Sequence, residues 1–125
     1  MTLHAPAASL TLELATNEST RSRGLMERAV LAPHTGMLFV FAHEGPVTFW
    51  MKNTLIPLDM VFVGENGNVT AIAANVPSSK HDTPDEKIPR RSGQAKYVIE
   101  LPANEALKDG IKWGVKLPIH GFAAR

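Results

Sequence analysis

The sequence of 125 residues contains no cysteine, few aromatic residues and no long apolar run. Without cysteine, the chain can form no disulfide, use no thiolate nucleophile and offer no cysteine ligand to a metal. A membrane-spanning helix needs about 20 consecutive apolar residues. No segment approaches that length, so we expect no membrane insertion. The formal net charge is only +1, which gives no general attraction to nucleic acid or acidic membranes.

Several functional motifs are missing as well. The glycines form neither GxGxxG nor a P-loop, and there is no HExxH pair. No histidine lies within four residues of another, so the spacing predicts no metal site and no cofactor; solvated loop histidines are the ordinary interpretation. The basic residues are too dispersed to favour nucleic-acid binding. The N-terminal segment lacks the basic and apolar regions of an export signal.

What the sequence does contain is typical of a globular chain. Its hydrophobic fraction is 44% and its charged fraction is 20%. The length fits one domain, 1–125, with a core over about 8–119. Nothing in the sequence determines the oligomeric state.

Alternating and continuous apolar segments predict a strand-rich fold. Leu10, Leu12 and Leu14 alternate with polar residues, as in a half-buried strand. Leu58–Val63 is apolar except at Asp59, which is typical of a strand covered on both faces. The Asn66-Gly67 pair between two apolar runs is the strongest hairpin signal. Further strands are expected at Met37–Phe41, Val47–Lys52, Val69–Val76, Tyr97–Leu101 and Val115–Ile119, with a turn at Gly45-Pro46.

Two short helices accompany these strands. Asn17 is a suitable N-cap for a helix from Glu18 to about Met26, which Gly24 interrupts. Asn104 is a suitable cap for a second helix, which Gly110 would close. We expect an exposed loop over 77–92 and a tail over 120–125. The predicted fold is mainly β, a small β-sandwich or barrel-like domain with one or two short helices.

The candidate site lies in the segment that follows Gly45-Pro46. Trp50 and Lys52 lie on one face of the expected strand, and Asn53 and Asp59 follow closely. A tryptophan beside a lysine, an asparagine and an aspartate gives an apolar platform with donors and acceptors at its edge, which suits a small polar ligand. The alternatives are that Trp50 belongs to the core and that Asn53 serves only the turn.

Asp59 interrupts an otherwise apolar strand, and an unpaired buried carboxylate is strongly unfavourable. It therefore needs partners, which could be Lys52, an arginine of the first helix, or backbone N–H groups of the bend at 53–55. Either it only holds that bend together, or it faces a ligand.

Two arginines and a glutamate complete the candidate set. Arg23 and Arg28 could belong to a solvated helix face, or one of them could pair with Asp59 or with an anionic ligand. Glu100 lies between Ile99 and Leu101, where an outward glutamate is the ordinary interpretation and a buried pair with an arginine the sharper one.

These segments resemble the DUF192 family of bacterial and archaeal proteins. The resemblance rests on the strings at Arg23–Arg28, Gly36–Phe41, Phe49–Asp59 and Tyr97–Leu101, which lie in the family's order and span about 10–117. It implies a compact, mainly β domain. It also implies a periplasmic or exported location, since many relatives carry an N-terminal signal; this chain shows none, so cytoplasmic is the alternative. The family brings no established reaction or cofactor.

The leading hypothesis is a small-molecule binding or accessory domain of the cell envelope. Its ligand-binding residues would be Trp50, Lys52, Asn53, Asp59, Arg23, Arg28 and Glu100. One alternative is a hydrolase or lyase that acts on a polar or sugar-like substrate, with Asp59 and Glu100 as an acid/base pair. A further alternative is a protein-interaction module, which predicts a large exposed apolar patch.

Overall fold

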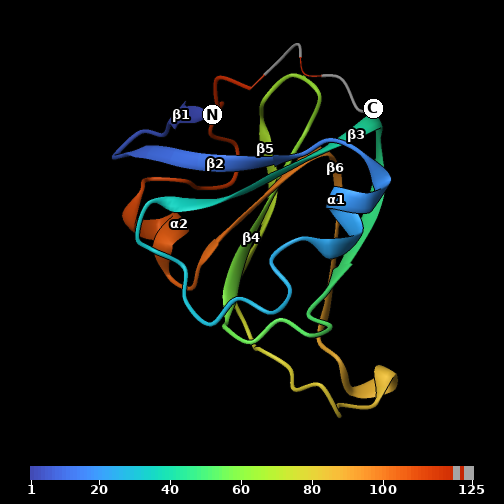
Figure 1. Ribbon diagram of the computed structural model, residues 1–125. Helices are drawn as coiled ribbons and strands as arrows, with labels where there is room; N and C mark the ends of the chain where they lie inside the picture. Colours follow the sequence, from blue (N-terminus) through green and yellow to red (C-terminus); the bar gives the residue numbers. More distant parts are fainter. Residues whose placement is uncertain (120–121, 123–125) are drawn as a thin grey trace.

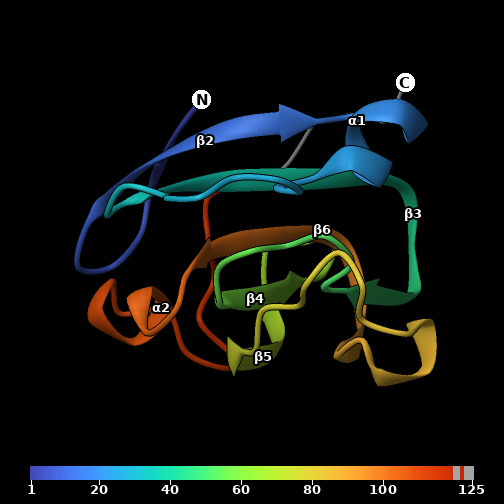
Figure 2. The same cartoon turned by 60° about the horizontal axis from the view of Figure 1, so that its bottom comes forward.

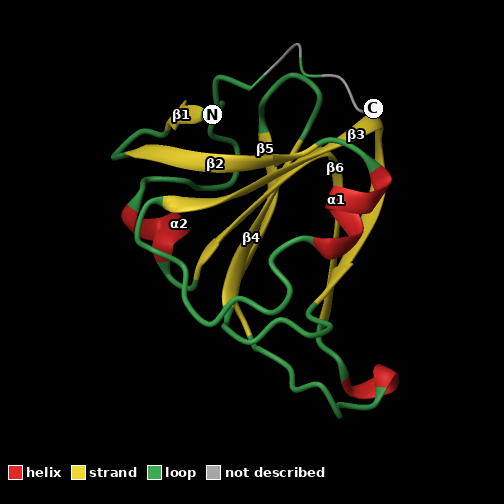
Figure 3. Cartoon of the chain, in the orientation of Figure 1, coloured by secondary structure: helices red, strands yellow, loops and turns green. Residues whose placement is uncertain are grey.

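A computed structural model describes residues 1–119 and 122 of the chain. Its six strands form one sheet in the order β1-β2-β3-β6-β4-β5, as Figures 1 and 3 show. Neighbouring strands are antiparallel except β2 and β3, which are parallel. The elements are β1 (Thr2–His4), β2 (Ser9–Ala15), α1 (Glu18–Arg23), β3 (Thr35–Trp50), β4 (Leu58–Val63), β5 (Val69–Val76), η1 (Asp85–Lys87), β6 (Arg90–Pro102) and α2 (Glu105–Lys108). The mainly β prediction is confirmed.

The long strand β3 bends the sheet. Its pairing with β6 is interrupted between Val40 and Gly45, and Figure 2 shows β3 turning sharply there. The sheet consequently folds over on itself but does not close into a barrel, since β1 and β5 remain its two ends. The predicted turn at Gly45-Pro46 is wrong, because both residues continue β3. Proline is tolerated there because this half of β3 pairs with β6 alone, as an edge strand does.

The central strand and its hairpin follow the sequence closely. All six residues of β4 are buried, as expected for a strand covered on both faces. The turn between β4 and β5 has Gly67 at φ +89°, and Gly67 N–H donates to Gly64 C=O at 2.9 Å. Val63 pairs with Val69, so the predicted hairpin is confirmed with a five-residue connection at 64–68.

Helix α1 begins at the predicted cap. Asn17 Oδ1 accepts the Thr20 N–H at 2.8 Å, and the Thr20 side chain returns a bond to the Asn17 backbone. The helix ends at Gly24, whose φ of +48° suits glycine, and therefore stops short of the predicted Met26.

Two segments near the C-terminus depart from expectation. The loop predicted over 77–92 ends earlier, because β6 begins at Arg90 and pairs with the end of β3. The strand predicted at Val115–Ile119 is wrong: Lys116 makes only an isolated bridge to Asn68. The predicted tail at 120–125 lies outside the described residues except Phe122, which is partly buried against the core.

The sheet separates two apolar clusters. One contains Leu10, Leu12, Val61, Leu101 and Ala106 among its members, and the other contains Leu25, Phe39, Met60 and Val98. Figures 1 and 2 show α1 next to β3, and α2 at a different side of the sheet. No helix among residues 1–119 has the length and apolar character required to cross a membrane.

Candidate functional site

A pocket opens where α1 and the turn after it face the bent half of β3. Its volume is about 300 Å³, at the small end of the range of about 300–1,000 Å³ for ligand pockets. Most of its wall is apolar, and the apolar lining comes from Leu25, Met26, Phe39, Phe41, Phe49 and Trp50.

The aromatic part of the wall is organised around Phe49. Its ring centroid lies 4.8 Å from that of Phe39 and 6.0 Å from that of Phe41, with interplanar angles of 85° and 83°. Edge-to-face packing of this kind is favourable and restricts ring motion. The pocket therefore has a preformed apolar wall.

Trp50 lies at the pocket between two cations. Lys52 Nζ is 5.0 Å from the indole ring centroid, and Arg90 Cζ is 5.1 Å from it. The indole is half-buried and lines the pocket. Lys52 Nζ also lies 3.6 Å from Asp85 Oδ1. Lys52 contacts the tryptophan but does not line the pocket. The structure thus brings Trp50 and Lys52 together, but Lys52 lies in the turn after β3 and not in the strand predicted over Val47–Lys52.

Glu100 reaches the pocket from β6. Its exposed fraction is only 5%, and it lines the pocket. Burial raises the pKa of Glu100 to about 8, because an apolar environment disfavours the charged carboxylate. No hydrogen bond or ion pair of its side chain is present among the described residues. The prediction of an outward glutamate is wrong, and so is the prediction of a buried pair with an arginine.

The arginines of α1 divide into two kinds. Arg21 Nη1 donates to the carbonyl oxygens of Thr16 and Val40, each at 2.9 Å, and its guanidinium lies 5.4 Å from the Phe41 ring centroid. Arg23 lines the pocket but is exposed, and its guanidinium makes no ion pair within the described part of the chain. Arg21 therefore holds the helix against the sheet, whereas Arg23 is left for solvent or a ligand.

Asp59 performs a different task from the one predicted. Its carboxylate accepts three backbone N–H groups, from Asn75 at 2.9 Å, Asn104 at 3.0 Å and Ala106 at 2.9 Å. The prediction that Asp59 pairs with Lys52, with an arginine or with the bend at 53–55 is therefore wrong. Backbone donors are sufficient to satisfy a buried carboxylate. Asp59 ties β5 and the start of α2 to β4 and lies outside the pocket lining.

Arg28 and Asn53 also lie outside the pocket lining. Arg28 pairs with Glu13, with Nη2 at 2.8 Å from Oε1, and this hydrogen bond lowers the pKa of Glu13. Asn53 has a left-handed φ of +51°, and its carbonyl accepts the Glu27 N–H at 2.9 Å. Arg28 therefore makes a surface ion pair, and turn chemistry accounts for Asn53.

The acid/base pair proposed for an enzyme is not assembled. In the register of β4 and β6, Glu100 is opposite Met60 and Asp59 is opposite Leu101. Side chains that are directly opposite share a face, and successive ones alternate. Asp59 and Glu100 consequently lie on opposite faces of the sheet and cannot serve a common cavity.

The alternative of an interaction module stays a prediction. The described large apolar side chains that are exposed come from five separate segments, namely Leu14, Val30, Leu55, Leu107 and Trp113. Their exposure alone defines no continuous surface.

Sequence reasoning missed the aromatic wall and Arg21. Phe39 and Phe41 are two residues apart in β3, a spacing that places both on one face. The bend after Val40 folds β3 back and brings Phe49 against Phe39 and Phe41. In the sequence, this bend looks the same as an ordinary turn at Gly45-Pro46.

Comparisons with known proteins match these features to a family and to two solved structures. The DUF192 family model, described as "Uncharacterized ACR", matches residues 1–119. A protein of Sinorhizobium meliloti 1021, described as a candidate transcription regulator, is 36% identical, with a TM-score of 0.77 over 93% of this chain and 88% of that one. A protein of unknown function from Novosphingobium aromaticivorans DSM 12444 is 31% identical, with a TM-score of 0.72 over 94% and 82%. No curated protein matches the chain.

Proposed function

The chain belongs to the DUF192 family, and we propose that it binds a small molecule with an apolar body and an anionic or carbonyl group in the pocket between α1 and β3. The observation that carries this proposal is the Glu100 carboxyl, which is buried in the wall of an otherwise apolar pocket without a protein partner among the described residues. A polar group in that position requires a complement, and a ligand can supply it.

The protonation state of Glu100 determines what it recognises. With a pKa of about 8, most of the carboxyl is protonated at neutral pH, and a protonated carboxyl donates one O–H hydrogen bond. Its ligand complement is therefore an acceptor, such as a carbonyl or carboxylate oxygen. A cationic amine would instead favour the ionised form of Glu100. An amine therefore serves as a probe that should bind less well than an acceptor.

Arg23 and Trp50 supply the other two elements of recognition. Arg23 brings a cation to the pocket and has no side-chain hydrogen bond or ion pair among residues 1–119, and a guanidinium suits a carboxylate that it can bind with two hydrogen bonds. Trp50 offers a ring that Lys52 and Arg90 already flank, so the ligand's apolar part would pack against the pocket side of the indole. In this arrangement Lys52 positions the Trp50 ring and does not touch the ligand.

The proposal is tested with benzoate and phenylacetate as anionic probes, benzamide as a neutral acceptor and benzylamine as the cation. Titrations followed by two-dimensional amide NMR on the full chain should show saturable shifts at residues of the pocket for the acceptors. Arg23→Gln and Trp50→Leu should weaken benzoate binding by about tenfold or more, since each removes a charge-assisted bond or a buried ring contact.

Arg28→Gln is the matched control, because Arg28 pairs with Glu13 away from the pocket. It should leave benzoate binding unchanged. Equal binding by the parent and by Arg23→Gln, a stronger response to benzylamine than to benzoate, or no pocket shifts with any of the four probes would overturn the proposal.

The cellular location of the protein is also part of this proposal. The family resemblance predicts a periplasmic or exported protein of the cell envelope, with the cytoplasm as the alternative. Fractionation of cells that express the gene from its own start, with detection of the protein in periplasmic and cytoplasmic fractions, decides between them.

A further inference from the structure

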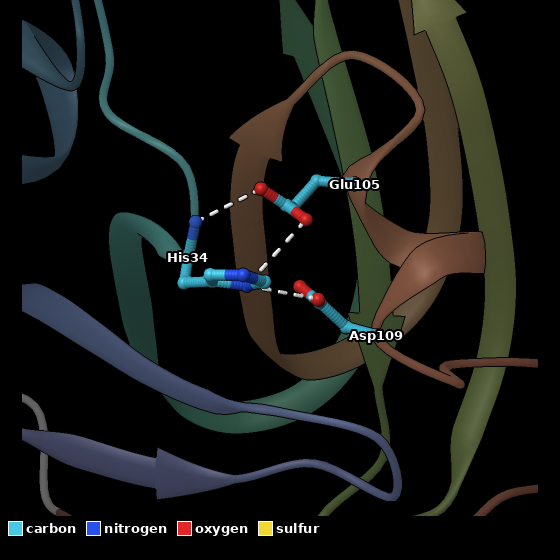
Figure 4. Close-up of side chains that lie close together, drawn as sticks. All are labelled: His34, Glu105 and Asp109. Atoms are coloured by element: carbon cyan, nitrogen blue, oxygen red, sulfur yellow. Dashed lines mark hydrogen bonds and ion pairs between the residues drawn. The ribbon is translucent and has the colours of Figure 1, made fainter.

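Three ionisable side chains meet beside α2, away from the pocket. Figure 4 shows His34, Glu105 and Asp109 turned toward one another. His34 Nδ1 lies 3.0 Å from Asp109 Oδ1 and 3.6 Å from Glu105 Oε2. One potential ligand atom from each residue falls within 4.8 Å of the other two.

The fold holds these side chains in place from both sides. Glu105 and Asp109 are four residues apart at the two ends of α2, which puts them on the same helical face. His34 precedes β3 with a left-handed φ of +60°, and its backbone N–H donates to Glu105 Oε1 at 2.9 Å. That bond leaves Glu105 Oε2 turned toward the imidazole.

Asp109 is the feature that ordinary packing does not explain. Its side chain is completely buried, and neither carboxylate oxygen has a hydrogen-bond partner among the described residues. His34 Nδ1 comes within 3.0 Å of it without hydrogen-bond alignment. A cation bound between these two buried acids would supply the partner that both Asp109 oxygens lack.

We propose that His34, Glu105 and Asp109 bind a divalent transition-metal ion, with zinc as the reference ion. Metal–ligand bonds of about 2.0–2.2 Å place neighbouring ligand atoms roughly 3–3.6 Å apart, and the separations of 3.0 Å and 3.6 Å from His34 Nδ1 agree with that spacing. The imidazole favours zinc, copper, iron or nickel, and the two carboxylates also suit manganese, whereas calcium takes six to eight oxygens.

The exposure of His34 and the number of protein ligands are also consistent with a bound ion. His34 is exposed, with 52% of its side chain accessible, so an ion would approach the buried acids from the His34 side. Three protein ligands leave at least one coordination position for water or another molecule, as in catalytic rather than structural zinc sites. The sequence carries no short motif for this cluster, because 71 positions separate His34 from Glu105.

The test is isothermal titration of the full chain with zinc chloride and with manganese chloride, after treatment with a chelator and dialysis. One ion per chain is expected. His34→Ala and Asp109→Asn should each weaken binding by about tenfold or more. His81→Ala is the matched control, because His81 is also exposed and faces a single carboxylate, Glu27, at 3.1 Å.

Cobalt supplies a second measurement, because its visible absorption reports coordination by the protein. The absorption should develop in the parent and in His81→Ala but not in His34→Ala. If Asp109→Asn does not fold, as circular dichroism will reveal, His34→Ala alone decides, since His34 is an exposed loop residue. Undiminished binding in His34→Ala, loss of binding in His81→Ala, or no binding of either metal by the folded parent would overturn the proposal.

Discussion

Glu100→Gln is expected to change how the stability of the protein depends on pH. Glu100 has a pKa of about 8 in the folded chain against an ordinary value of 4.5. Between these two pH values, the unfolded chain has released the proton that the folded chain still holds, so stability falls as pH rises. The full difference corresponds to about 5 kcal/mol, at 1.36 kcal/mol for each pH unit.

Glutamine has nearly the same shape but does not titrate, so the variant lacks this slope. Glu100→Gln should resemble the parent near pH 4.5 and exceed its free energy of unfolding by about 3 kcal/mol at pH 7, with a further gain up to pH 8. Denaturant unfolding at several pH values, followed by tryptophan fluorescence, measures the difference. Glu86→Gln, at an exposed position in η1, is the control for loss of a charge.

Parallel stability curves for the parent and Glu100→Gln between pH 5 and pH 8 would refute the reasoning. They would mean that the Glu100 carboxylate is solvated or paired in the folded protein. The same result would weaken the assignment of Glu100 as a hydrogen-bond donor to a ligand, because that role depends on a retained proton.

Two further substitutions test the scaffold around the site. Asp59→Ala leaves three backbone N–H groups without their acceptor and should lower the free energy of unfolding by about 3 kcal/mol or more, measured by denaturant unfolding; a loss below 1 kcal/mol would contradict the role of Asp59 as their common acceptor. Gly24→Ala forces a side chain onto a backbone with φ +48° and brings its Cβ within 3.2 Å of Phe39. It should lower the melting temperature, at a cost of about 1–3 kcal/mol, and an unchanged melting temperature would show that this turn relaxes freely.

Local patterns predicted those elements whose determinants lie within a few residues. The cap at Asn17, the fully buried Leu58–Val63 and the return strand Val69–Val76 follow from side-chain periodicity and turn chemistry. The bend in β3 does not, because Gly45-Pro46 carries the same signal in an edge strand as in a turn. The register with β6 decides between the two, and pairing with a distant strand is not encoded locally.

The site was predictable only in part for the same reason. Trp50, Arg23 and Glu100 were all named as candidates and all three line the pocket, but Glu100 was expected to point outward or to pair with an arginine. Asp59, like Glu100, is a carboxylate in an otherwise apolar strand. What separates them is the face of the sheet on which each lies and the backbone donors that reach it, both of which depend on tertiary structure.

The burial of every residue in β4 has a consequence before the protein folds. Leu58–Val63 is a short, β-prone segment without proline, the composition that promotes self-association when exposed on a nascent chain. Asp59 is its only charge. We therefore expect Asp59, which later accepts N–H groups from β5 and from the start of α2, also to limit association of this segment during synthesis. Loss of its carboxylate would affect the yield of soluble protein as well as its stability.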